Sequence, residues 1–300
     1  MLQKKRKYCD PICYNSIVIT YVQAILLGAL QGVTELFPIS SLGHSVLVPT
    51  LLNWHIDQSA NSFLVFLVAT HLATAVVLLG FFFKDWVLIV QGVVRSLKNR
   101  VIDEKDHYAK LGWLIIVASI PAGILGLLFE EKLKLLFASA LLVSVCLIIN
   151  GTMLYGAELL KKRNREYRGD VDIAIAKMSW GRSVFIGFAQ CMALIPGFSR
   201  TGATLGGGLL SGLNHEEAGR FSFLLATPII FAAGLLKLPD LSTAGAGVIG
   251  PLIAGVIAAG SCAYLTVRFL TRYFKHNTLT PFALYCVLAG SASLLFLLIR

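Results

Sequence analysis

Long apolar segments alternate with short polar segments along most of this 300-residue chain. Ten stretches of at least fifteen residues contain no Asp, Glu, Lys or Arg: 11–34, 36–56, 58–83, 111–129, 135–157, 183–199, 201–215, 221–236, 241–267 and 276–299. A helix that crosses a bilayer needs about 20 predominantly apolar residues, so most of these stretches are long enough to span one. The pattern therefore predicts an all-α polytopic membrane protein.

The first half of the chain predicts helices over 17–36, 40–52, 62–83, 111–129 and 135–160. Pro38 separates the first two, because proline interrupts a helix. The charged turn Glu130-Glu131-Lys132 separates the last two. The basic segment between 84 and 110 is expected to be a loop, with Trp86–Val94 lying along the membrane surface.

The second half of the chain repeats this plan. Runs 183–199 and 201–215 are too short to span comfortably and meet near Pro196-Gly197, and helices are expected near 218–236, 246–270 and 280–299. Gly28-x-x-Gln31 matches Gly187-x-x-Gln190, and Ser62-Phe-Leu matches Ser222-Phe-Leu at nearly the same separation. These matches indicate an internal repeat, with halves at about 17–160 and 183–300.

The number of crossings in each half gives the topology. If each short polar pair of helices enters the membrane and returns on the same side, each half has three true crossings, and the halves are oppositely oriented. We therefore expect one integral-membrane domain over 1–300, an inverted repeat with about six spanning helices and two re-entrant helical hairpins. Residues 1–10 are expected to be a basic tail that is not cleaved. If both basic loops are cytoplasmic, three crossings in each half place the amino terminus outside. The Lys and Arg residues of the tail favour the cytoplasm instead, so the two indications conflict.

Composition agrees with a membrane protein, because 56% of residues are hydrophobic and only 14% are charged, against about 25% charged in soluble domains. The net charge of +10 raises the question of nucleic acid. Thirteen of the 26 cations, however, lie in the stretches 84–110 and 161–182 between apolar runs. This distribution is typical of cytoplasmic loops. We expect no nucleic-acid partner.

The first candidate site lies between Gln31 and His44, where polar groups interrupt an apolar region. Gln31 and Glu35 are four residues apart and share a helix face. Glu35 is expected to be a metal ligand or a general acid or base, and Gln31 can contact metal or substrate. Ser40 is equally a candidate N-cap or anion-binding residue at a helix start. Ser41 and His44 can share a face as nucleophile and proton partner.

The second candidate site is the segment Pro196-Gly-Phe-Ser199-Arg200-Thr201-Gly-Ala-Thr204. It again places hydroxyl groups, those of Ser199, Thr201 and Thr204, at an expected helix start. Arg200 stands alone between two apolar runs, and a guanidinium in such a position can grip a phosphate in a bidentate manner. An anion site, an arginine, a carboxylate and a Ser/His pair together indicate phosphoryl transfer or phosphoanhydride hydrolysis within the membrane.

These two segments resemble the signatures of a known family. Gln31-Gly-Val-Thr-Glu35 is similar to the (Glu/Gln)-x-x-x-Glu motif of the bacterial undecaprenyl-diphosphate phosphatases associated with bacitracin resistance. The segment from Pro196 to Thr204 is similar to that family's Pro-Gly-x-Ser-Arg-x-x-x-Thr motif. The resemblance covers residues 17–300.

The resemblance implies a multi-pass hydrolase of the plasma (inner) membrane that removes one phosphate from undecaprenyl diphosphate and so recycles the lipid carrier for peptidoglycan synthesis. It implies Mg²⁺ or Ca²⁺ as cofactor and an active site towards the outer face. Glu35 would bind metal or act as acid or base, Ser41 and His44 are rival nucleophiles, and Arg200 would hold the diphosphate with Ser199 and Thr204. The alternative is a polyprenyl-phosphate transporter or flippase, because inverted repeats with broken helices also occur in transporters. The oligomeric state stays open, with a homodimer as one alternative.

Overall fold

The computed structural model describes residues 19–58, 60–136, 139–161, 170–241 and 246–300, and within these ranges every regular element is helical. The α-helices are α1 Tyr21–Thr34, α2 Ser41–Leu51, α3 Asn61–Phe81, α4 Phe83–Asn99, α5 His107–Leu136, α6 Ala140–Leu160, α7 Val171–Ala176, α8 Trp180–Cys191, α9 Arg200–Leu210, α10 His215–Leu241, α11 Ala246–Tyr273 and α12 Thr280–Ile299, with a 3₁₀ turn at Met192–Leu194. The expected basic tail at 1–10 lies outside the described residues.

Six of the described helices contain segments long and apolar enough to cross a membrane. These segments are Asn61–Phe81, His107–Phe129, Ala140–Leu160, His215–Lys237, Ile249–Tyr273 and Thr280–Ile299. α1, α2, α8 and α9 are shorter, with 11 to 14 residues each. The prediction of an all-α polytopic membrane protein is therefore confirmed.

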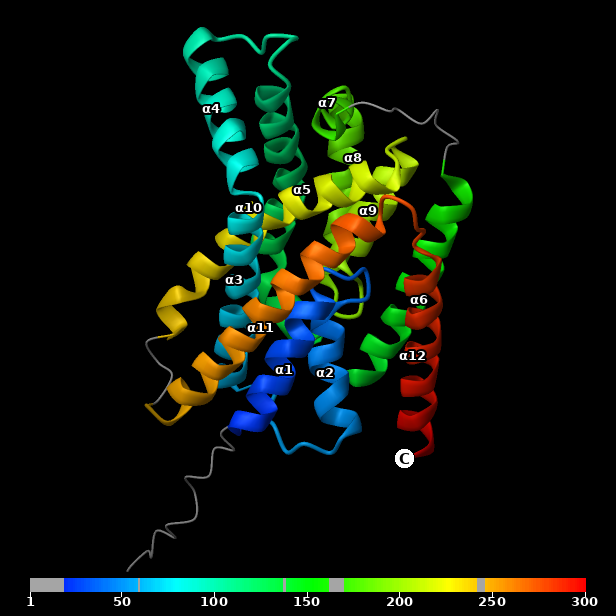
Figure 1. Ribbon diagram of the computed structural model, residues 1–300. Coiled ribbons are helices and arrows are strands. Elements are labelled where there is room, and N and C mark those ends of the chain that lie inside the picture. Colours follow the sequence, from blue (N-terminus) through cyan, green and yellow to red (C-terminus); the bar gives the residue numbers. More distant parts are fainter. Residues whose placement is uncertain (1–18, 59, 137–138, 162–169, 242–245) are drawn as a thin grey trace, which may run out of the picture.

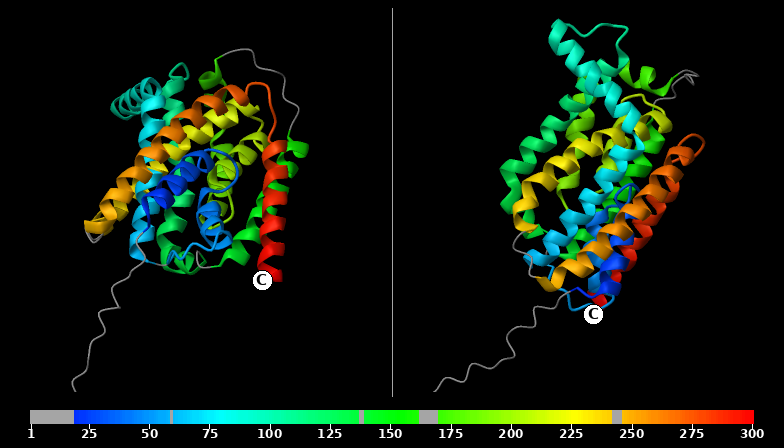
Figure 2. Two further views of the ribbon diagram at one scale, coloured as in Figure 1. Left: turned by 60° about the horizontal axis from the view of Figure 1, so that its bottom comes forward. Right: turned by 60° about the vertical axis from the view of Figure 1, so that its left-hand side comes forward.

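The two short helices of the first half lie in the centre of the molecule. α1 begins and α2 ends at the lower side of Figure 1, and the turn that joins them lies in the middle. Figure 2 shows the same pair with α6 and α12 to one side and α3 to the other. A central position suits the polar groups of this turn, because in lipid such groups need partners from the protein.

Glycines allow α1 to pack closely against α11. A Cβ atom added at Gly28 would lie 2.2 Å from the carbonyl oxygen of Gly255, and one added at Gly32 would lie 2.2 Å from that of Ala259. Small residues four apart are the usual means by which membrane helices approach at backbone distance. This contact fixes the position of α1, and with it Gln31 and Glu35, at the end of the helix.

Helices of one half pack against helices of the other half in corresponding pairs. α1 packs on α11 and its repeat counterpart α8 packs on α5, while the counterparts α6 and α12 pack on each other, as do α3 and α10. A pseudo-two-fold relation between the halves would produce these corresponding contacts. The inverted orientation and the re-entrant character of the two hairpins stay predictions, which cysteine labelling from each side of the membrane tests.

Two sequence-based expectations about the first half were wrong. The turn at Glu130-Glu131-Lys132 does not form, because α5 continues through these residues to Leu136. The basic segment after Lys84 is also mostly helical, since α4 runs from Phe83 to Asn99. α4 packs on α5, with Gly92 against the backbone of Ala109, and the upper end of α4 projects beyond the other helices in Figure 1. Tertiary contact with α5 thus overrides the loop signal of the basic residues.

Candidate active site

The starts of α2 and α9 meet in the middle of the molecule. Ser40 is the N-cap of α2 and accepts the N–H of Gly43, while Ser199 is the N-cap of α9 and accepts the N–H of Gly202. Both serines are therefore capping residues, as serine favours. Each helix start presents free backbone N–H groups, which makes an anion-binding position.

Asn150 of α6 joins the two loops that precede these helix starts. Its Nδ2 donates to the carbonyl oxygen of Pro38 over 3.0 Å, and its Oδ1 accepts the N–H of Ser199 over 3.0 Å. The side chain is fully buried. A second bond joins the loops directly, because Thr201 Oγ1 donates to the carbonyl oxygen of Glu35 over 2.9 Å. Segments about 165 residues apart are thereby held in register.

Glu35, at the end of α1, is the centre of the polar cluster. The carboxylate is buried, with 6% of the residue exposed. Its Oε1 accepts from Arg200 Nη2 over 2.7 Å, and its Oε2 accepts from the hydroxyl of Ser41. Burying an unpaired carboxylate is costly, and the guanidinium offsets that cost here. The ion pair joins the two motifs that the sequence separates.

Helix α3 supplies a third wall of the cluster. His71 Nε2 lies 3.1 Å from Glu35 Oε2, and Thr74 Oγ1 donates to Gln31 Oε1 over 3.1 Å. The same contact leaves Gln31 Nε2 directed towards Glu35 Oε2, at 3.4 Å. Gln31 therefore turns its amide nitrogen, and not its oxygen, towards the carboxylate.

Only one of the two terminal nitrogens of the Arg200 guanidinium binds Glu35. Its Nη2 binds Glu35, whereas its Nη1 is buried and has no partner among the described residues. A buried guanidinium nitrogen without an acceptor is costly and is a common sign of a missing ligand. A phosphate oxygen is the acceptor that its geometry suits best.

His44 points away from this cluster. Its Nδ1 lies 2.6 Å from the carbonyl oxygen of Ser40, and its Nε2 lies 2.8 Å from the hydroxyl of Tyr285, on whose ring it stacks. Since a carbonyl oxygen only accepts, Nδ1 carries the hydrogen and Nε2 accepts from the tyrosine. Ser41 is instead bound to Glu35, so the described contacts do not pair Ser41 with His44.

The remaining predicted residues hold the second helix start together. Ser199 Oγ lies 3.4 Å from the carbonyl oxygen of Phe37, and Thr204 Oγ1 bonds the carbonyl oxygen of Arg200 and the hydroxyl of Ser222. The structure thus brings Gln31, Glu35, Ser41 and Arg200 into one cluster. It places Ser40, Ser199, Thr201 and Thr204 in the supporting loops and helix starts.

Three residues of this region were missed by the sequence analysis: His71, Asn150 and Tyr285. His71 had a signal, because it is an ionisable group in the otherwise uncharged run 58–83. Ionisable groups inside a membrane are usually functional, and His71 could have been singled out on that ground. Asn150 and Tyr285 had no comparable signal, since they are uncharged and their partners lie between 49 and 241 positions away in the sequence.

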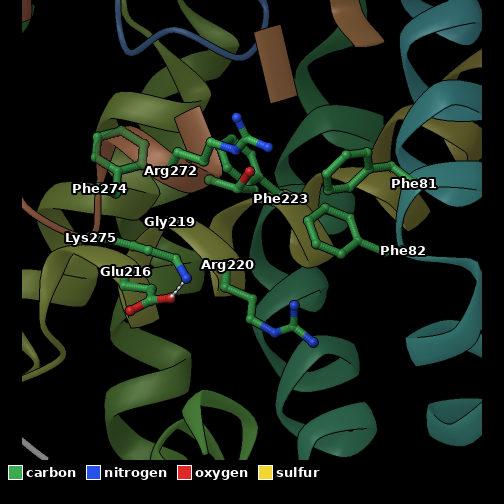
Figure 3. Close-up of a pocket in the computed structure, with 10 residues that line it drawn as sticks. Phe81, Phe82, Glu216, Gly219, Arg220, Phe223, Arg272, Phe274 and Lys275 are labelled. Carbon is green, nitrogen blue, oxygen red and sulfur yellow. Dashed lines mark ion pairs between the residues drawn. The ribbon is translucent and has the colours of Figure 1, made fainter. Parts of the chain in front are cut away.

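A separate cavity of about 250 Å³ lies where the ends of α3 and α11 meet the start of α10. Figure 3 shows the rings of Phe81 and Phe82 on one side and the ion pair of Lys275 with Glu216 on the other. Neither Glu35 nor Ser41 lines it. The central cluster and this cavity are therefore two separate places in the molecule.

The central cluster fits a metal ion only in part. No group of three or more His, Cys, Asp or Glu side chains gathers anywhere in the described ranges. Mg²⁺, however, is commonly held by one or two carboxylates, with substrate phosphates and waters completing its shell. Glu35 fits that pattern, and the amide oxygen of Gln31 lies beside it, where it accepts one hydrogen bond from Thr74.

Comparisons with known proteins agree with this description. The family model described as "Bacitracin resistance protein BacA" matches residues 24–292. A protein of Mycolicibacterium paratuberculosis named undecaprenyl-diphosphatase is 47% identical over 303 aligned residues, which cover 94% of this chain and 99% of the relative. A protein of Chromobacterium violaceum named undecaprenyl-diphosphatase 2 is 44% identical, with 93% and 99% covered.

Proposed function

Because the chain belongs to the bacitracin resistance protein BacA family, we propose that it hydrolyses undecaprenyl diphosphate to undecaprenyl phosphate and inorganic phosphate. The observation that carries this proposal is the buried contact of Ser41 and Arg200 with the two oxygens of Glu35. A hydroxyl, a base and a guanidinium with a free nitrogen are what phosphoryl transfer to a side chain requires.

Ser41 is the proposed nucleophile. Its oxygen forms a bond to the terminal phosphorus, the bond from that phosphorus to the bridging oxygen breaks, and undecaprenyl phosphate leaves with the bonding electrons. The proton of Ser41 passes to Glu35, which accepts the hydroxyl's hydrogen bond, and Glu35 then gives this proton to the bridging oxygen of the leaving undecaprenyl phosphate and is a carboxylate again. Water then attacks the phosphoserine with Glu35 as its base, which releases inorganic phosphate and returns a proton to Ser41. His44 is the less favoured nucleophile, because Tyr285 occupies its Nε2.

The diphosphate is bound by charge and by backbone donors. Arg200 Nη1 is free to receive a phosphate oxygen while Nη2 stays on Glu35. The starts of α2 and α9 add the partial positive charge of their helix ends. Together these groups would neutralise the charge that develops on the transferred phosphoryl group.

A divalent ion, Mg²⁺ or Ca²⁺, belongs to the proposal as cofactor. Glu35 would hold it together with the diphosphate oxygens, and the ion would supply further neutralisation of phosphate charge. Gln31 would contact the ion or the substrate, because its amide oxygen accepts one hydrogen bond, from Thr74, and keeps a second lone pair.

The proposal also includes the place of the reaction. The lipid enters from the bilayer, and the proposed setting is the inner (plasma) membrane, with the active site towards the outer face. The product returns the lipid carrier to peptidoglycan synthesis. Removal of the diphosphate form is expected to make cells resistant to bacitracin.

The proposal is tested by phosphate release from undecaprenyl diphosphate with purified protein in detergent. We expect one phosphate and one undecaprenyl phosphate per substrate when Mg²⁺ is present. A chelator is expected to lower the rate by about tenfold or more, and added Mg²⁺ or Ca²⁺ to restore it, since the ion neutralises phosphate charge. A folded preparation that releases no phosphate with either ion present would refute the proposal.

A further inference from the structure

His71 lies on the oxygen of Glu35 that Ser41 also uses. Its Nε2 is 3.1 Å from Glu35 Oε2, the atom that accepts the hydroxyl of Ser41. The side chain is largely buried, with 18% of it exposed. Neither sequence motif contains this residue, because it belongs to α3 and lies 36 positions after Glu35.

The orientation of the ring is fixed by its own helix. His71 Nδ1 lies 2.7 Å from the carbonyl oxygen of Leu67, one turn earlier in α3. The carbonyl oxygen and the carboxylate both only accept, so Nδ1 donates to Leu67 and Nε2 donates to Glu35. This is the arrangement by which an outer partner usually orients a functional group.

α3 and α1 meet along a pair of matched polar contacts. His71 and Thr74 are three residues apart on α3, and Gln31 and Glu35 are four apart at the end of α1, so each pair shares one helix face. Thr74 binds Gln31 and His71 binds Glu35. The histidine therefore acts on the carboxylate from the side opposite to Arg200, which holds the other oxygen.

We propose that His71 is a positioning residue for the reaction. It fixes Oε2 of Glu35 so that the carboxylate faces the hydroxyl of Ser41, while Arg200 fixes Oε1. This inference rests on the proposed function, because it assigns His71 a role in proton transfer from Ser41. The described contacts of His71 are with Glu35 and Leu67, so its loss is expected to lower kcat and to leave KM nearly unchanged.

Two substitutions separate this role from a structural one. In His71→Gln the side-chain amide nitrogen can reach the place of Nε2 and donate to Glu35. In His71→Asn the shorter side chain reaches only the place of Nδ1, so it keeps the bond to Leu67 and loses the carboxylate. A role confined to packing within α3 would favour the asparagine.

The experiment measures kcat and KM for phosphate release from undecaprenyl diphosphate by the full-length wild type and the two variants. We expect His71→Asn to lose about 10- to 100-fold in kcat, as loss of an orienting partner usually does. His71→Gln is expected to recover a large part of that loss at unchanged KM. An asparagine variant as active as the glutamine variant, or a loss confined to KM, would overturn the proposal.

Thermal unfolding in detergent supplies a readout that does not depend on turnover. His71→Asn, Glu35→Gln and the double variant form a cycle, in which contact between the two side chains predicts a double variant less destabilised than the sum of the single variants. Strict additivity would contradict the contact and the inference with it. A wild type that releases no phosphate would instead refute the proposed function, and the cycle would still test the contact.

Discussion

Glu35→Gln is expected to lower kcat for phosphate release by roughly 10³-fold, the usual contribution of a general base. The amide has nearly the size of the carboxylate and can still contact Arg200 or Ser41, but it cannot accept the proton of the attacking hydroxyl. The loss is therefore expected in the chemical step and not in folding. Steady-state phosphate release, together with gel filtration and thermal unfolding, measures both.

Glu158→Gln is the matched control for this substitution. Glu158, near the end of α6, is also paired, with His215 over 2.8 Å and with Lys161. Its partners are distinct from those of Glu35, so its loss is expected to affect stability more than kcat. A Glu35→Gln enzyme that keeps the wild-type rate would exclude Glu35 as the base.

Arg200→Lys is expected to lower kcat by about 10²-fold, as removal of one transition-state donor usually does. Lysine keeps the charge, but it is a point donor and cannot bind Glu35 and a phosphate oxygen through two fixed nitrogens. Arg200→Ala is expected to lose about 10³-fold, because both donors and the charge are removed. KM for the diphosphate is expected to rise in both variants.

Arg268→Lys serves as the comparison for Arg200→Lys. Arg268 is an exposed arginine of α11, and its side chain takes no part in the central cluster. The same change of residue type should leave turnover near the wild-type value. If Arg200→Lys behaved like Arg268→Lys, the two nitrogens of Arg200 would not be needed, and the proposed phosphate contact would be wrong.

The class of fold could be predicted because helices that span a membrane require long uncharged, apolar runs, and these are visible in the sequence. Long uncharged runs gave the six spans, and Pro38 and Pro196-Gly197 marked the two breaks. The prediction failed at Glu130-Glu131-Lys132, where three charges suggested a turn and α5 continues instead. Charged residues are compatible with a helix, so charge alone did not decide where the helix ended.

Half of the site was also readable from the sequence, because Glu35 and Arg200 are both ionisable residues within an apolar chain. Which side chains of the site contact each other could not be predicted from the sequence. Spacing placed Ser41 and His44 on one helix face, but His44 binds Tyr285, which is 241 positions away. His71 took the place beside Ser41 and Glu35 instead. Local periodicity tells which residues can share a face, whereas long-range packing decides what that face meets.

The most direct test of Ser41 as nucleophile is the rate of phosphate release by Ser41→Ala, measured beside Ser45→Ala. Ser45 lies one turn further along α2, and its hydroxyl bonds only the carbonyl oxygen of Ser41 among the described contacts. We expect Ser45→Ala to turn over close to the wild-type rate. Ser41→Ala is expected to lose about 10³-fold or more, since the attacking oxygen is absent. Turnover by folded Ser41→Ala at a rate near that of Ser45→Ala would contradict the proposed mechanism.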